Sequence, residues 1–206
     1  MTILKEKLTL PCGAQIKNRI CKAAMTERIA FSDNYTNHRH LNLYKKWAEG
    51  DIGILLTGNV QVDKKHLEGP ANVCIEEETY IEQLPLLRKW AEEGTKDNTH
   101  LWMQISHAGR QTPGEINSSP KAPSSVQLKI PGRNYGIPSA LTTEEIQEII
   151  KRISLDFTFC GLSSSNFCFS VRCPEVISAI CFKELYPFGP VKQLAFLVFT
   201  KSVKIF

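Results

Sequence analysis

Residues 16–27, IKNRICKAAMTE, decide how this chain is interpreted. A charged entry at residues 17–19 leads into an apolar, strand-like run that ends in Ala23, Ala24, Met25 and Thr26. At the carboxyl end of a strand in a parallel α/β barrel, alanines let a flat ring system approach the backbone, and a threonine hydroxyl supplies a hydrogen-bond donor. The segment therefore favours a barrel strand that ends at a binding site.

The composition is that of a globular chain with one sizeable core, because 42% of the 206 residues are hydrophobic and 22% are charged. The net charge is only +4 and both signs are interspersed, so we expect no nucleic-acid partner. The apolar run at residues 194–199 is far shorter than the about 20 residues of a membrane helix. Charges at residues 5–7 interrupt any secretory leader, and the seven cysteines are an odd number. We expect reduced thiols, no membrane association and a cytoplasmic location.

Strand and helix signals alternate along the first three quarters of the chain. A turn at Pro11, Cys12 and Gly13 predicts a hairpin, which we interpret as a plug under a barrel. The predicted strands lie at residues 20–24, 51–62 (DIGILLTGNVQV) and 100–110 (HLWMQISHAGR, with its loop). The predicted helices lie at residues 41–49, at residues 83–93 with Pro85 in the first turn, and after a capping box of Thr142 and Glu145. Such an alternation predicts right-handed βαβ units.

The pattern ends near Ile153. Residues 154–206 are rich in Phe, Cys and Ser and have neither a sustained helical period nor a clean alternation. We therefore expect no fourth strand and helix, and only residues 176–182 have some strand character. The predicted organisation is a first unit at residues 1–153 and an unmatched tail at residues 154–206.

The three strand ends, AAMTE, TGNVQV and QISHAGRQ, together resemble those of the Old Yellow Enzyme family of FMN-dependent NAD(P)H oxidoreductases, over roughly residues 8–153. The resemblance implies an α/β fold that is a partial TIM (β/α)8 barrel, with an N-terminal hairpin, about three βα units and an atypical C-terminal tail. It also implies FMN as cofactor and NAD(P)H as reductant. The implied cofactor contacts are Ala24, Met25, Thr26, Gly58 and Gln104.

By the resemblance, the backbone at Ala24 and Met25 lies against the flavin ring, and Thr26 donates to the flavin carbonyl beside the reactive nitrogen. Gly58 lets the flavin pack closely, and the Gln104 amide bonds to the pyrimidine edge. Each position also has a purely structural interpretation: Thr26 as a loop cap, Gly58 as a turn glycine, and Gln104 as a buried amide bonded to a loop backbone.

Two histidine-containing features carry no predicted chemistry. His107 and Arg110, in SHAGRQ, are expected to hold the loop after the third strand. The histidines and cysteines lack the spacing of a zinc motif, so no metal is expected.

The resemblance implies hydride transfer from NAD(P)H through flavin to an electron-poor alkene, a small-molecule substrate. The family's carbonyl-gripping pair, proton donor and phosphate site have no match after residue 153. We therefore expect no catalytic residue here, weak or absent flavin binding, and no activity of the chain alone, as for a truncated isoform or a misread gene model. Two alternatives stay open. One is a non-catalytic fragment that associates with itself or with a full-length relative through open barrel edges; the other is a different barrel enzyme that binds a phosphorylated substrate.

Overall fold

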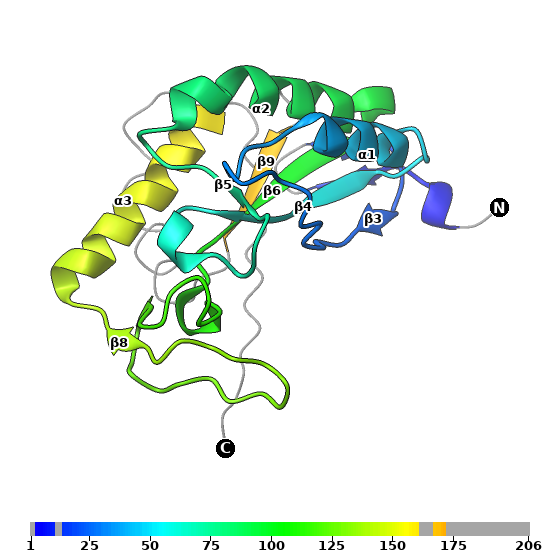
Figure 1. Ribbon diagram of the computed structural model, residues 1–206. Coiled ribbons are helices and arrows are strands. Elements are labelled where there is room, and N and C mark those ends of the chain that lie inside the picture. Colours follow the sequence, from blue (N-terminus) through cyan, green and yellow to red (C-terminus); the bar gives the residue numbers. More distant parts are fainter. Residues whose placement is uncertain (1–2, 11–13, 161–166, 172–206) are drawn as a thin grey trace.

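The central feature is an open parallel sheet. The computed structural model describes residues 3–10, 14–160 and 167–171. The sheet has the strand order β3 (Cys21–Lys22), β4 (Ile54–Gln61), β6 (His100–Ser106), β9 (Phe167–Val171), and β5 (Val73–Cys74) pairs with the end of β4. Helices α1 (His38–Ala48) and α2 (Tyr80–Gly94) lie together over one face, and α3 (Thr143–Cys160) lies at the side of the sheet (Figure 1). The predicted α/β class and partial barrel are confirmed, and the described strands do not close into a full barrel.

The predicted hairpin is present and lies at the amino-terminal ends of the parallel strands. Strands β1 (Leu8–Thr9) and β2 (Gln15–Ile16) pair antiparallel. The ring Nε2 of His100, at the start of β6, lies 3.0 Å from the carbonyl oxygen of Gln15. The side chain of Ile16 packs on Gly53, where an added Cβ would lie 2.8 Å from it. The hairpin thus covers the end of the sheet opposite to the one where the predicted site residues lie.

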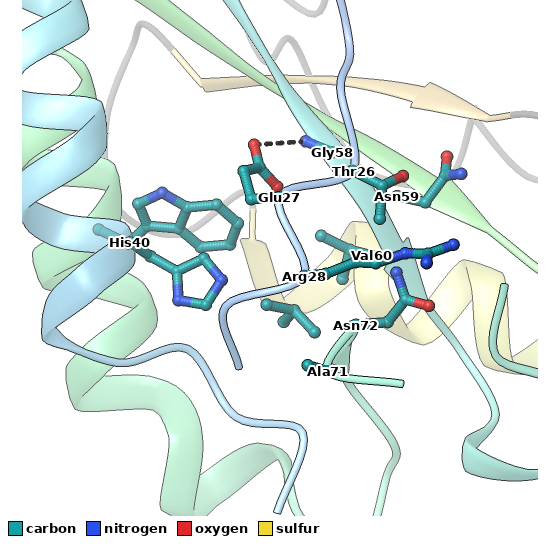
Figure 2. A pocket seen from close by; sticks show the side chains of 11 residues that line it. Thr26, Glu27, Arg28, His40, Gly58, Asn59, Val60, Ala71 and Asn72 are labelled. Carbon is teal, nitrogen blue, oxygen red and sulfur yellow. Dashed lines mark hydrogen bonds between the residues drawn. The ribbon is translucent and has the colours of Figure 1, made fainter. Parts of the chain in front are cut away.

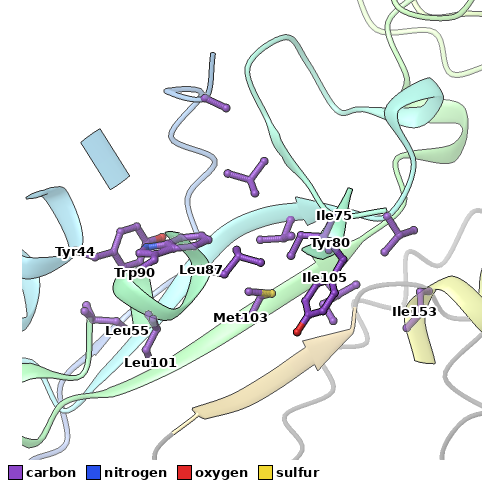
Figure 3. Close-up of a cluster of buried hydrophobic side chains, with 14 of the residues drawn as sticks. Tyr44, Leu55, Ile75, Tyr80, Leu87, Trp90, Leu101, Met103, Ile105 and Ile153 are labelled. Carbon is purple, nitrogen blue, oxygen red and sulfur yellow. The ribbon is translucent and has the colours of Figure 1, made fainter. Parts of the chain in front are cut away.

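The main core lies between the sheet and the helices. Leu55 of β4 and Leu101 and Met103 of β6 alternate toward α1 and α2, and all three are buried (Figure 3). The Tyr44 ring of α1 meets the Trp90 ring of α2 edge to face, with centroids 5.1 Å apart. Full burial of an aliphatic side chain contributes about 1.5–3 kcal/mol, so this layer fixes the position of the sheet and its strand ends.

The long loop that connects β6 with α3 contains a little regular structure. Strands β7 (Lys121–Ala122) and β8 (Ser139–Ala140) pair parallel within it. The remaining short elements are 3-10 turns, namely η1 (Ile3–Lys5), η2 (Lys64–His66), η3 (Lys96–Asn98) and η4 (Gly109–Gln111). The predicted capping box opens α3, because the Thr142 N–H donates to Glu145 Oε2 at 2.9 Å and the Glu145 N–H donates to Thr142 Oγ1 at 3.3 Å.

Two local expectations were wrong. Helix α2 begins at Tyr80, so Pro85 lies inside the helix and not in its first turn. The first parallel strand is only Cys21–Lys22, so residues 24–26 lie in the segment that follows it. Lys22 Nζ also donates to the Leu56 carbonyl at 3.0 Å, which adds a side-chain bond between this segment and β4.

The expectation that no strand follows Ile153 was also wrong. Helix α3 continues to Cys160, and β9 then pairs parallel with β6 from Leu101↔Phe167 to Ile105↔Val171. β9 has only five residues, and in so short a run alternation does not separate a strand from other structure, so the pattern there gave no strand signal. The segment 176–182 lies outside the described residues. The division of the chain at residue 153 stays a prediction.

Candidate functional site

A β-bulge in β4 organises the carboxyl end of the sheet. The register runs Leu56↔Trp102 and then Asn59↔Gln104, so two residues of β4, Thr57 and Gly58, oppose one residue of β6. The Thr57 hydroxyl accepts the backbone N–H of Gln104 at 2.9 Å and donates to the Gly58 carbonyl at 2.8 Å. Because the bulge shifts the alternation by one residue, Asn59 and not Gly58 lies opposite Gln104.

Four polar side chains meet at this end of the sheet. The Thr26 hydroxyl donates to Glu68 Oε2 at 3.0 Å, and the Asn59 amide nitrogen donates to the same oxygen. The Gln104 amide nitrogen donates in turn to the Asn59 carbonyl oxygen. Two of the predicted cofactor residues, Thr26 and Gln104, are therefore joined through two side chains that the sequence did not single out.

Gly58 is close to these residues, but its missing side chain is explained by the chain itself. An ideal Cβ on Gly58 would lie 2.5 Å from the Met25 carbonyl oxygen and 2.9 Å from Thr26 Cα. The Gly58 N–H donates to Glu27 Oε1 at 3.3 Å and to the Tyr44 hydroxyl oxygen at 3.2 Å. Glycine is needed here so that the segment after β3 can cross β4. A flavin contact at Gly58 stays a prediction.

The Glu27 carboxylate is held by a buried phenol. The Tyr44 hydroxyl donates to Glu27 Oε1. Burial, and then the negative charge of Glu27, raise the pKa of Tyr44 well above its ordinary value. The phenol therefore stays protonated and acts as a donor, which fixes Glu27 beneath the segment that carries Thr26.

Ala24 and Met25 flank the four polar side chains in different ways. Ala24 packs against Leu56 and Trp102 on the face of the sheet that points away from α1 and α2. Met25 is 54% exposed, which is high for an apolar side chain. The five predicted cofactor residues thus gather at one end of the sheet, and of these five Thr26 and Gln104 belong to the side-chain network with Glu68 and Asn59.

A small pocket opens beside this network, between the segment after β3, the end of β4 and the loop before β5 (Figure 2). Arg28 takes a left-handed backbone conformation, with φ 53°, and its guanidinium lies against Gly69. His40 lines the deep side of the pocket near Trp90. Burial lowers the pKa of His40 to about 4, and its Nδ1 accepts the Asn37 N–H at 3.2 Å as part of a helix cap. His40 is therefore a neutral structural residue at neutral pH.

A second polar cluster lies at the loops after β4 and β6. His66 Nδ1 lies 2.8 Å from Asp63 Oδ2, and the His107 ring stacks on the His66 ring with centroids 4.4 Å apart. Burial alone would raise the pKa of Asp63, but the hydrogen bonds from His66 and from the Lys65 N–H, with the charges of His66 and Arg152, lower it to about 2. Burial, and then the nearby His66, lower the pKa of His107 to about 4.

This cluster has the residue types of a metal site, but its central histidine has no free lone pair. Potential ligand atoms of Asp63, His66 and His107 all lie within 4.8 Å of one another. However, His66 Nε2 accepts the Lys121 N–H at 2.8 Å, so the ring carries its proton on Nδ1 and donates it to Asp63. His107 takes part through the stacking of its ring on His66, and its Nε2 is buried without a hydrogen-bond partner among the described residues. The expected role of His107, which is to hold the loop after the third strand, stays a prediction.

Sequence reasoning missed Asn59 and Glu68. Asn59 is 9% exposed in a strand of mostly apolar residues, so its amide required a partner, and this was the available signal. Glu68 lies in a loop far along the sequence from Thr26, and no local pattern predicts their contact.

The comparisons with known proteins identify the family and the fold of the chain. The model of the NADH:flavin oxidoreductase / NADH oxidase family matches residues 10–155. The chain is 28% identical over 162 residues to the NADH-dependent flavin oxidoreductase iliE of Neonectria sp. (strain DH2), covering 71% of this chain and 21% of that protein. It is 33% identical over 142 residues to an NADH oxidase of Thermoanaerobacter brockii, covering 66% of this chain and 21% of that protein.

Among solved structures, the Old Yellow Enzyme from Pichia sp. AKU4542 superposes with a TM-score of 0.68 at 21% identity, covering 82% of this chain and 45% of that one. This likeness shows the fold, which is part of a TIM barrel of the Old Yellow Enzyme type. The chain belongs to the NADH:flavin oxidoreductase / NADH oxidase family. It spans about a fifth of the length of the two curated relatives above.

No helix in the described part of the chain is long and apolar enough to cross a membrane.

Proposed function

We propose that the chain carries the first part of an FMN site for an NAD(P)H-dependent oxidoreductase that reduces electron-poor alkenes or related acceptors. The observation that carries this proposal is the joining of Thr26 and Gln104 in one network at the carboxyl end of three neighbouring parallel strands. Barrel enzymes place their sites at this end. The names of the two relatives, an NADH-dependent flavin oxidoreductase and an NADH oxidase, support NADH as the reductant.

The donor set at this end fits a flavin. The pyrimidine edge of the ring alternates carbonyl acceptors with one N–H donor, and a glutamine amide offers both kinds of group. In the described structure one N–H of the Gln104 side chain donates to Asn59. The amide can still donate its second N–H to a ligand and accept a hydrogen bond at its carbonyl oxygen. Thr26 has one hydroxyl proton, and Glu68 holds it, so a bound carbonyl has to compete for that proton. When bound, FMN would supply hydride transfer between NAD(P)H and the acceptor.

The protein residues have separate tasks in this proposal. Ala24 and Met25 would offer backbone and small side-chain surface to the ring, Thr26 and Gln104 would orient its polar edge, and Gly58 would keep the segment after β3 close to β4. Exposure of Met25 leaves this surface accessible. We assign no catalytic acid or base among the described residues.

A titration of the purified chain with FMN, followed by quenching of flavin fluorescence, tests this function. We expect saturable but weak binding, because the groups that the family uses for the phosphate have no counterpart that we recognise in this sequence. Thr26→Val and Gln104→Leu should each weaken binding about 10-fold, since a hydrogen bond worth about 1.4 kcal/mol corresponds to that factor. A matched control is Thr143→Val, an exposed threonine at the start of α3. Equal quenching by all four proteins would refute the site.

A second candidate, association through open sheet edges, is favoured by one observation. Within the described residues β3 is hydrogen-bonded only on its β4 side, and the neighbouring Ile20 is 39% exposed. Such an edge is a template for pairing with a second chain. Light scattering over a concentration series should show self-association, and a constant monomer mass at high concentration would exclude it.

We also propose that the chain is cytoplasmic and that it does not turn over substrate on its own. Cell fractionation tests the location, and an NADPH consumption assay tests the activity.

A further inference from the structure

Glu68 differs from the other members of the polar network because its carboxylate can only accept hydrogen bonds. It lies between η2 and β5 and is half-buried. One of its oxygens, Oε2, accepts from both the Thr26 hydroxyl and the Asn59 amide. Because an ionised carboxylate has no proton to give, only the nitrogen end of the Asn59 amide can face it.

The orientation of Asn59 in turn determines that of Gln104. With its nitrogen toward Glu68, Asn59 presents its carbonyl oxygen to Gln104, and the Gln104 nitrogen donates to it. Both amides are nearly buried, with 9% and 7% of their residue surface exposed. Water therefore has little access to satisfy a wrongly oriented amide. A reversed Asn59 amide would place its oxygen against the Glu68 carboxylate, and a reversed Gln104 amide would place its oxygen against the Asn59 oxygen.

We propose that Glu68 is a positioning residue that orders the Asn59 and Gln104 amides in series and so fixes the pattern of donors and acceptors that Gln104 offers to the flavin edge. This inference rests on the proposed function for its ligand. The series of bonds from Glu68 through Asn59 to Gln104, called the relay below, does not depend on any ligand. Side chains that are ordered before binding lose less conformational entropy when the complex forms. The relay therefore favours a ligand edge whose donors and acceptors match the orientation of the Gln104 amide over an edge with the reversed pattern.

The Glu68→Met variant isolates this role. The Thr26 hydroxyl and the Asn59 amide both donate to Oε2 of Glu68. A methionine has a similar length but no oxygen that could accept either bond. Either the Asn59 amide then reverses, and Gln104 with it, or a buried donor is left unpaired. Glu68→Gln is the conservative variant, because a carbonyl oxygen in the place of Oε2 can accept both bonds.

The first experiment needs no flavin. Side-chain amide signals of Asn59 and Gln104 are recorded in ¹H–¹⁵N NMR spectra of the full chain and assigned with Asn59→Leu and Gln104→Leu. In Glu68→Met we expect both pairs of signals to move or to double, although no hydrogen bond joins Gln104 to residue 68 in the described structure. Glu68→Gln keeps an acceptor oxygen and should leave one set of signals. Glu78→Met makes the same chemical change at an exposed position and should change nothing. Unchanged Asn59 and Gln104 signals in Glu68→Met would overturn the proposal.

The second experiment measures FMN affinity. We expect Glu68→Met to weaken FMN binding about 10-fold, the factor that corresponds to about 1.4 kcal/mol. In a Gln104→Leu background the same change should cost almost nothing, because the relay then has no end point. Equal losses in both backgrounds would refute the positioning role. If the wild-type chain binds no FMN at all, the proposed function fails, whereas the NMR experiment still decides on the relay. Circular dichroism of each variant identifies any that does not fold, and Asn59→Leu, which interrupts the relay at its middle, then carries the comparison.

Discussion

The segment after β3 crosses β4 at Gly58, so the addition of a single methyl group at this position should lower the stability of the fold markedly. In Gly58→Ala the added methyl group would lie 2.5 Å from the Met25 carbonyl oxygen and 2.9 Å from Thr26 Cα. The methyl group would also meet a carboxylate oxygen of Glu27, a side chain that can rotate away, whereas the Met25 and Thr26 atoms belong to the backbone and leave no such room. Overpacking of this kind costs typically about 1–3 kcal/mol, and we expect a value in the upper half of that range.

The assay is urea unfolding followed by circular dichroism, with thermal unfolding as a second measurement. For a chain of this size each kcal/mol corresponds to roughly 2–4 °C, so Tm should fall by about 4–12 °C. Gly132→Ala is the matched control, because its Cβ would meet no atom within 4 Å and only its φ of 74° opposes the change. It should cost about 1 kcal/mol. A Gly58→Ala variant no less stable than Gly132→Ala would refute the close crossing.

Three further changes test other parts of the structure. Burial lowers the pKa values of His40 and His107 from 6.5 to about 4, so the unfolded chain binds more protons below pH 6.5 and stability falls as the pH drops from 6.5 toward 4. At pH 5 the loss should be about 2 kcal/mol per histidine relative to pH 7.5, and urea midpoints that are equal at the two pH values would contradict it. Tyr44→Phe removes a donor from the Glu27 carboxylate and should lower the free energy of unfolding by about 1–3 kcal/mol, whereas an unchanged urea midpoint would mean that the bond contributes nothing. Thr142→Ala removes one half of the α3 capping box and should cost about 1 kcal/mol in the same assay, and no loss would show that the cap is made by other groups.

The parts of the fold that local periodicity controls could be predicted from the sequence. The capping residues Thr142 and Glu145 mark the start of α3 because their bonds are made within one helical turn. Apolar spacing located the three helices and the strands β4 and β6 to within a few residues. Pro85 was placed wrongly because helix α2 starts three residues earlier than its apolar spacing suggests.

The details of the site depend on contacts between distant segments, and these have no local signature. The bulge at Thr57 exists because its hydroxyl bonds to a backbone N–H of the neighbouring strand, 47 positions away. Strict alternation from Leu56 would have turned Gly58 toward the site, whereas the bulge places Asn59 there. Glu68 reaches Thr26 across 42 positions. The five residues that the motif comparison selected lie at one end of the sheet, whereas the hydrogen bonds among their side chains required the folded chain.

The most direct test of the central claim is to map FMN onto the chain by backbone amide shifts in ¹H–¹⁵N spectra during a titration. The claim is that the flavin lies at the carboxyl ends of β3, β4 and β6. We predict that the largest shifts occur at Met25, Thr26, Asn59 and Gln104, and that they saturate together with one dissociation constant. Shifts confined to other parts of the chain, such as the hairpin of β1 and β2 at the opposite end of the sheet, or no shifts at all, would contradict it.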